Sequence, residues 1–193
     1  MNGGQAVTVR CKVLTGLSYQ QEAELVYQIS QGQKRLSLAD TIYARLEAKS
    51  DPALNDVKQI TAKVGYNWPI RNVHPGPYDI LANRALVNAY KLLGVRMFEM
   101  MLCLLKSTWK GDPASVSGVM LSGMALFLKT YEGTYSDQVF IKHLALVQPK
   151  EIEKKANSDY STSNNALRCA KAIWNQYNKG CRGNRKLPYL FQG

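Results

Sequence analysis

Helix start signals recur along most of this chain, and they constrain its fold more than any other feature of the sequence. Ser18 and Gln21 form a capping box, in which the two side chains can each bond a backbone N–H at the start of a helix. Asp51 and Asp112 each precede a proline, which is well tolerated at the first helical position. Apolar residues spaced three and four apart follow these signals. We therefore expect a mainly α fold.

The capping signals and the apolar spacing together define the expected helices. They cover residues 18–29, 37–46, 52–65, 80–92, 95–109, 113–128, 136–147, 149–156 and 164–177. Asp79 is predicted to cap the helix over 80–92, and Gly94 separates this helix from the next one. The segment 113–128 is apolar around much of its circumference, which is typical of a central helix. Its Gly118, Ser122 and Gly123 are small enough to permit close approach by a neighbouring helix.

A short strand is expected before the first helix. Residues 5–14 alternate apolar and polar side chains and include the β-branched Val7, Val9 and Val13. A period of two with such residues is the signature of a strand. The predicted fold class is therefore mainly α, with a short N-terminal strand followed by a multi-helix bundle in one domain or two small lobes.

The chain length of 193 residues and the apolar content of 46% suffice for a buried core in one domain or two small lobes. Residues 66–78 contain three prolines and a glycine, a density of helix breakers that favours a connector. The expected units are a first unit over 1–65, the connector over 66–78, a helical domain over 79–178 and an extended basic tail over 179–193. The sequence leaves open whether this tail is mobile.

Targeting and cysteine features favour a cytoplasmic protein with reduced thiols. The sequence has no apolar run long enough to span a bilayer, and its first residues lack the layout of a secretory signal. The four cysteines show no C-x-x-C spacing, and only two histidines could assist them as metal ligands. Cys11 and Cys103 lie in apolar runs, where a reduced thiol behaves as a small hydrophobe. We therefore expect reduced, buried thiols, and neither zinc nor a disulfide framework.

A formal charge of +11 and a pI near 9.5 make a polyanion the first partner to consider, although solvated surface charge and an acidic protein partner are alternatives. The segment 166–186 carries cations and no acidic residue, and Trp174 and Tyr177 lie among them. The cations, all six of which are candidate phosphate-binding residues, are Arg168, Lys171, Lys179, Arg182, Arg185 and Lys186. We expect the two aromatic side chains to lie in the core and residues 179–186 to bind phosphate.

A second candidate anion site is the turn over residues 31–35. Gly32 would bend the chain there, and Lys34 and Arg35 would place two cations beside the backbone N–H groups of a helix start. A solvated turn is the alternative reading. The sequence lacks the glycine-rich phosphate-loop motifs that would make the site more specific.

Catalysis finds little support in the sequence. His74 begins the rigid turn His74-Pro75-Gly76-Pro77, and His143 lies in a predicted helix, so both are expected to be structural. Hydrolase, metalloprotease and carboxylate-cluster motifs are missing from the sequence. We expect a non-enzymatic protein that needs no metal and no cofactor.

Several blocks of the sequence resemble phage and plasmid ParB-like proteins. Residues 11–17, 22–25 and 33–37 resemble the later part of a ParB/sulfiredoxin-like domain. Further blocks resemble the helical C-terminal region of those proteins, at residues 85–90, 104–109, 123–128 and 177–183. This resemblance implies a DNA-associated protein of a phage or mobile element, working in the cytoplasm of a bacterial host.

The resemblance also implies that the reactive part of the domain is missing. In such proteins the nucleotide- or DNA-processing site depends on a D-G-x-H-R-type segment before the strand that here begins at Gln5, and this chain starts just after that point. A second family motif, an asparagine-containing turn that holds nucleotide phosphate, corresponds to residues 30–35, where Ser30 replaces the asparagine. The resemblance therefore implies neither nuclease nor nucleotidase activity.

Two functions follow as hypotheses. In the first, the chain binds DNA or RNA through Lys34, Arg35 and residues 182–186, and the helices over 80–109 form a helix-turn-helix. In the second, a phage-encoded inhibitor of the anti-CRISPR kind binds a host defence ribonucleoprotein at its effector or its guide RNA. A third reading treats the chain as a fragment, because residues 190–193 resemble a protease-site remnant.

Overall fold

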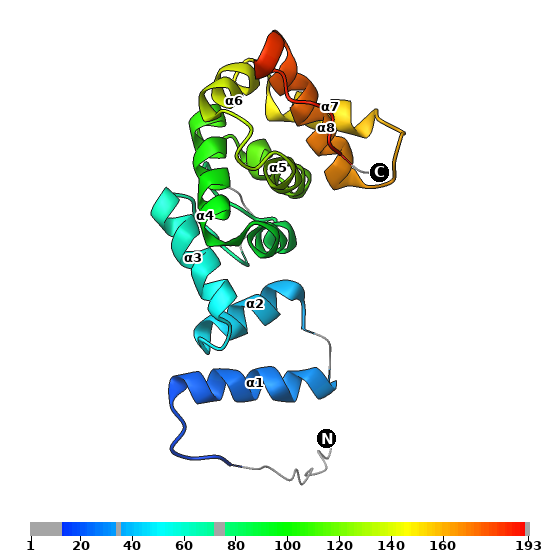
Figure 1. Ribbon diagram of the computed structural model, residues 1–193. Helices are drawn as coiled ribbons and strands as arrows, with labels where there is room; N and C mark the ends of the chain where they lie inside the picture. Colours follow the sequence, from blue (N-terminus) through cyan, green and yellow to red (C-terminus); the bar gives the residue numbers. More distant parts are fainter. Residues whose placement is uncertain (1–12, 34–35, 72–75, 192–193) are drawn as a thin grey trace.

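The computed structural model describes residues 13–33, 36–71 and 76–191, and these residues are mainly helical, as expected (Figure 1). The α-helices are α1 (Tyr19–Gln33), α2 (Leu38–Glu47), α3 (Pro52–Val64), α4 (Asn83–Trp109), α5 (Gly118–Thr130), α6 (Asp137–Leu144), α7 (Pro149–Asn157) and α8 (Asn165–Asn178). Two short 3-10 helices are η1 (Pro113–Val116) and η2 (Gly183–Arg185). None of the helices in the described ranges combines the length and the apolar run that a bilayer crossing would need.

The expected N-terminal strand is not part of this fold as far as the structure describes it. Residues 5–12 lie outside the described residues, and Val13 and Leu14 belong to no strand. Within the three described ranges, extended pairing is limited to a single bridge between Asn67 and Asp79.

The capping signals give the right helix starts in most places. The Ser18 N–H donates to Gln21 Oε1 at 2.9 Å, which completes the predicted capping box. Ser37 Oγ accepts from the N–H of Asp40 at 3.1 Å, and α2 follows directly. The helix α3 ends at Gly65, whose φ of 83° is the left-handed conformation that glycine adopts most easily.

Two helices begin later than predicted. Asp112 caps only the short η1, and α5 starts after Ser117, whose Oγ accepts from the N–H of Met120 at 3.2 Å. Asp79 does not cap α4. Its carboxylate instead accepts from the Gly76 N–H at 2.8 Å and the Asn67 side chain at 2.9 Å, so α4 begins four residues further on, at Asn83.

The described part of the predicted connector packs into the protein. The Asn67 N–H donates to the Tyr78 carbonyl and the Asn67 carbonyl accepts from Ile80, both at 2.9 Å. Tyr66 and Ile80 are buried, and Trp68 Nε1 donates to Asn83 Oδ1 at 2.7 Å. The main apolar core includes residues of α3 before this segment and residues of α4 to α8 after it. Packing therefore continues from α3 through the described residues of this segment, 66–71 and 76–78, to α4.

The centre of the core is α5, which packs against α4 and α8. Its Phe127 ring lies among aromatic rings from three other parts of the chain, with centroid distances of 5.2 Å to Tyr131, 5.9 Å to Tyr177 and 5.9 Å to Phe140. The close approach predicted for the small residues of this segment is confirmed at Gly123, which faces Cys169 of α8. The position of α8 is thus fixed by direct helix contact.

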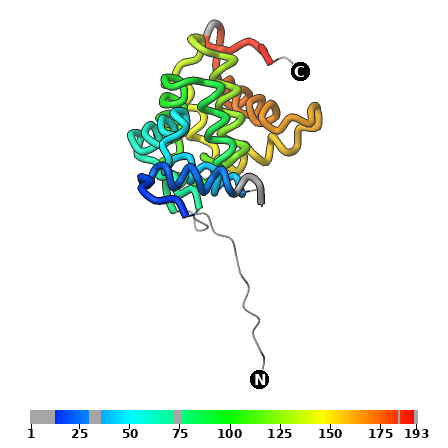
Figure 2. Tube along the Cα trace, turned by 90° about the horizontal axis from the view of Figure 1, so that it is seen from below, coloured from blue at the N-terminus to red at the C-terminus, as the bar shows by residue number. Residues whose placement is uncertain are grey.

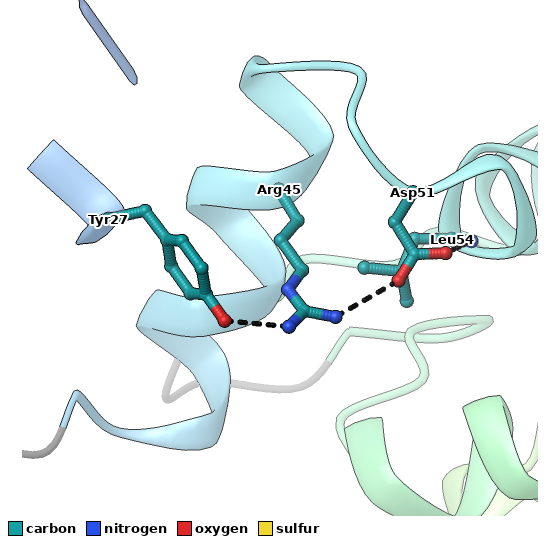
Figure 3. Close-up of polar contacts among 4 residues, drawn as sticks. All are labelled: Tyr27, Arg45, Asp51 and Leu54. Atoms are coloured by element: carbon teal, nitrogen blue, oxygen red, sulfur yellow. Dashed lines mark hydrogen bonds and ion pairs between the residues drawn. The ribbon is translucent and has the colours of Figure 1, made fainter. Parts of the chain in front are cut away.

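The end of the molecule that holds α1 lies opposite the end that holds η2 (Figures 1 and 2). At the end that holds α1, Arg45 of α2 bonds to residues of two other segments (Figure 3). Its guanidinium donates to the Tyr27 hydroxyl of α1 at 2.6 Å and to Asp51 Oδ2 at 3.3 Å. Asp51 also caps α3 by accepting from the N–H of Leu54. One side chain therefore links α1, α2 and the start of α3.

The cysteines differ from one another in exposure. Cys169 is buried and Cys181 is half-buried, but Cys103 is exposed, so its predicted burial is wrong. The apolar run around Cys103 forms a helix, and the helical repeat turns Cys103 outward while Leu102 and Leu104 face the core. Cys11 lies outside the described residues.

Thiol labelling should follow this difference in exposure. In the folded protein at pH 8, iodoacetamide is expected to modify Cys103 and Cys181 and to leave Cys169 intact. Burial raises the pKa of Cys169 to about 12, and the thiolate is the form that reacts. Peptide mass spectrometry with and without urea measures the result. Labelling of Cys169 in the folded protein as fast as Cys103 would show that the α5–α8 contact is not closed.

Candidate nucleic-acid interface

Cations from α6, α7, α8 and the segment after α8 lie around the C-terminal half of α8. This helix begins at Asn164, whose Oδ1 accepts from the N–H groups of Ala166 and Leu167, and the sequence contains no acidic residue after Asp159. Most of the helix is buried, including Tyr177, as expected. Trp174 is only partly buried, so it combines a core contact with access to the surface.

One pocket lies between α7 and α8 and has a volume of about 410 Å³. Its lining residues are Lys155, Asp159, Arg168, Lys171, Ala172, Asn175, Gln176 and Lys179. The predicted Arg168, Lys171 and Lys179 therefore line one pocket, together with Lys155, which the sequence did not point to. We call this hollow the α7–α8 pocket.

The Arg168 side chain makes structural hydrogen bonds. Its guanidinium donates to the backbone carbonyl of Asp159 at 3.2 Å and to the side chain of Asn165, so it braces the segment that leads into α8. Lys171 Nζ donates to Ser161 Oγ at 3.0 Å in the same segment. The pKa of Asp159 is lowered, chiefly by hydrogen bonds from Ser161 and further by the two nearby cations. Lys155 and Lys179 are exposed.

A second pocket, of about 460 Å³, lies between α6 and the segment after α8. Its lining residues are Gln138, Val139, Lys142, His143, Gly180, Cys181, Arg182 and Arg185. The predicted Arg182 and Arg185 line this α6–tail pocket, where Lys142 of α6 joins them. Lys186 is exposed nearby but does not line it. The lining contains no carboxylate, so an anion would meet only attractive formal charge.

The two pockets are neighbours. Lys179 lines one and the next residue, Gly180, lines the other. Gln176 of the α7–α8 pocket donates from Nε2 to the carbonyl of His143, which lines the α6–tail pocket, at 2.9 Å. We call the combined surface the basic end; its cations are Lys142, Lys155, Lys171, Lys179, Arg182 and Arg185.

The segment after α8, predicted as an extended tail, is anchored to the rest of the protein by Asn178 and Tyr131. Asn178 accepts from the Leu187 N–H at 2.8 Å and donates to the Leu187 carbonyl at 3.0 Å. Tyr131 Oη donates to the Pro188 carbonyl at 2.8 Å, and Phe191 is buried. Residues 179–186 therefore form a closed loop.

The cations of the basic end are not neutralised by ion pairs among the described residues. The ion pairs there use cations from other parts of the molecule, namely Arg45, Lys63, Arg71 and Lys129. Lys34 and Arg35, the other predicted pair, lie outside the described residues, and the helices that flank them, α1 and α2, belong to the opposite end of the molecule (Figures 1 and 2).

The two helices predicted over residues 80–109 are joined by a kink of one residue. Residues 83–109 form α4, and Gly94, with φ 71° and ψ 176°, divides it into two helical halves, which confirms the predicted break at this glycine. A helix-turn-helix needs a turn of about 3–4 residues and an exposed recognition helix. The second half of α4 buries Phe98, Met101 and Leu105 completely, so it faces the core.

His143 and Cys181 lie close together but do not form a catalytic pair. His143 Nδ1 lies 2.6 Å from the Tyr177 carbonyl, which can only accept, so this nitrogen carries the proton. Cys181 Sγ lies 3.9 Å from the same nitrogen and also donates to the Tyr177 carbonyl. The thiol therefore faces the ring nitrogen that cannot take its proton. In the described parts of the chain, no three metal-binding side chains converge.

Comparison with known proteins gives one match. A family model described as "Family of unknown function (DUF6551)" matches residues 1–191. No curated protein and no solved structure matches the chain.

Proposed function

We propose that this chain, which belongs to the DUF6551 family, is a non-catalytic nucleic-acid-binding protein that holds phosphates at its basic end. The observation that carries the proposal is the closed loop over residues 179–186. It presents Arg182 and Arg185 beside Lys142 of α6, with no carboxylate in the pocket lining. The earlier resemblance to ParB-like proteins of mobile elements agrees with a DNA-associated role and remains part of the proposal.

Charge and anchoring support this assignment together. Phosphates bound by lysine and arginine release condensed counterions, which is the main source of affinity for basic proteins of this kind. Arginine also offers a planar fork of donors that fits a phosphate. Because Asn178 and Leu187 hold the two ends of the loop, less chain entropy is lost on binding than for a free tail.

Neutralising the α6–tail pocket tests the proposal. The triple variant Lys142→Gln, Arg182→Gln and Arg185→Gln is expected to bind a labelled oligonucleotide about tenfold more weakly at low salt. The slope of log affinity against log salt should fall in magnitude by about 2, since each lost phosphate contact removes about 0.7–0.9. Fluorescence anisotropy over a salt series measures both quantities.

A matched triple variant controls for net charge. Lys58→Gln, Lys91→Gln and Arg96→Gln remove the same charge from exposed positions on α3 and α4. These changes should leave the affinity near that of the unmodified protein. Equal losses for both triples would mean that binding reflects overall charge and not the basic end. Failure of the unmodified protein to bind any nucleic acid would favour a protein partner.

A further inference from the structure

We infer that the nucleic acid held at the basic end is single-stranded, with a base stacked on Tyr189 and the adjoining phosphates on the lysines of the α7–α8 pocket. The inference rests on the proposed function and names its ligand class. It comes from an exposed aromatic side chain that the anchored tail holds beside the cations.

Tyr189 is 52% exposed although the residues that anchor its segment, Leu187 and Phe191, are buried. Its ring meets Trp174 with centroids 5.4 Å apart at 82° and Phe191 with centroids 5.6 Å apart at 74°. Neither neighbour stacks parallel to the Tyr189 ring, so these contacts position the ring without occupying the stacked arrangement that a base would adopt.

The support beneath this ring is rigid. Trp174 Nε1 donates to the carbonyls of Leu187 and Pro188, at 3.1 and 3.2 Å, which fixes the indole against the tail. Tyr131 holds the Pro188 carbonyl from the other side. A fixed aromatic ring loses little conformational entropy when a base stacks on it.

Positive charge lies over one face of the Tyr189 ring, so a stacked base would use the opposite face. Lys171 Nζ is 5.9 Å from the centre of the Tyr189 ring, and Lys171 also lines the α7–α8 pocket with Lys155 and Lys179. An aromatic platform next to a basic groove is the combination with which proteins hold unpaired strands, because every base has a face that can stack.

Helix α8, which carries most of the pocket lining, offers little to a duplex. Reading a duplex needs an exposed helix or ribbon that enters the major groove. Along α8 only Asn165 and Asn175 are exposed, and the other residues are buried or half-buried. In a duplex the bases are already stacked on each other, so Tyr189 would gain no contact with them.

The test compares Tyr189→Leu with Tyr189→Phe on matched ligands, namely a single-stranded DNA oligonucleotide, an RNA of the same sequence and the corresponding DNA duplex. The unmodified protein should bind both single strands more tightly than the duplex. Tyr189→Leu should weaken single-strand binding about fivefold or more, the loss expected for one base–aromatic stack, and leave the salt slope unchanged. Tyr189→Phe keeps the ring and should retain the affinity.

Each of the other outcomes contradicts either the single-strand inference or the proposed function. Equal or tighter binding of the duplex, or an unchanged affinity in Tyr189→Leu, would overturn the single-strand inference and leave phosphate binding at the basic end intact. Absence of binding to all ligands by the unmodified protein would overturn the proposed function itself. Thermal melting of both variants checks that the tail remains folded.

Discussion

Replacing Gly123 with alanine is expected to destabilise the protein by about 3 kcal/mol, at the upper end of what overpacking usually costs. A Cβ atom at this position would lie 2.5 Å from both Cβ and Sγ of Cys169 and 3.2 Å from the backbone nitrogen of Ala170. Since Cβ and the backbone cannot swing aside like a long side chain, α5 and α8 would have to move apart. Urea denaturation followed by circular dichroism measures the loss.

The direction of this effect is informative because helix propensity acts the other way. Alanine is favoured over glycine inside a helix by about 1 kcal/mol, so an open site would gain stability. Gly118 in the same helix provides that comparison. An added Cβ there would lie 3.9 Å from the Cβ atoms of Ala82 and Ala85, which is an ordinary contact. If Gly118→Ala and Gly123→Ala gave equal midpoints, the tight α5–α8 contact would be refuted.

The sequence could predict most helices because their start signals are local. Ser37 and Asp51 each cap the helix that follows them, as expected. The signal at Asp112 misled because Ser117 supplies a second cap five residues later, and the chain uses both, for a 3-10 turn and then for α5. Asp79 misled because its carboxylate is taken by Asn67 and Gly76, and a single sequence does not show such competition.

The site could be predicted only where it is continuous in the chain. Arg182 and Arg185 were identified because the acid-free run after Asp159 is visible in the sequence. Lys142 and Lys155 were missed because they come from α6 and α7, whose own segments contain acidic residues, and folding alone brings them to the pockets.

Two further points concern how side chains are used in the fold. Arg168 was predicted among the phosphate-binding cations, and in the structure two of its guanidinium nitrogens donate to the Asp159 carbonyl and to Asn165. The exposed Tyr189 gave no signal of its own, because its place on the surface depends on the burial of Leu187 and Phe191 around it. The contacts of Arg168 and the exposure of Tyr189 both depend on the folded structure, and the spacing of residues in the sequence does not predict them.

Replacing Asn178 with alanine is expected to open the tail and to speed its cleavage by trypsin about 30-fold or more. The Asn178 side chain makes two buried hydrogen bonds to the backbone of Leu187, and losing them leaves the buried Leu187 N–H unsatisfied and its carbonyl with only the Trp174 indole as donor. Such groups cost about 1–3 kcal/mol each, and in this regime cleavage follows the population of the open form. Mass spectrometry of the fragments cut after Arg182, Arg185 and Lys186 measures the rate.

Asn175→Ala is the matched control, because Asn175 lies on the same helix three residues earlier and is exposed. It should leave tail cleavage unchanged.

Oligonucleotide binding by the Asn178→Ala variant tests whether the proposed function depends on the closed loop. Asn178→Ala keeps every cation, so an effect of charge alone predicts an unchanged affinity. Binding by the closed loop instead predicts a lower affinity at each salt concentration of the series. Rapid cleavage with unaltered affinity would show that the cations act without the geometry that Asn178 and Leu187 impose.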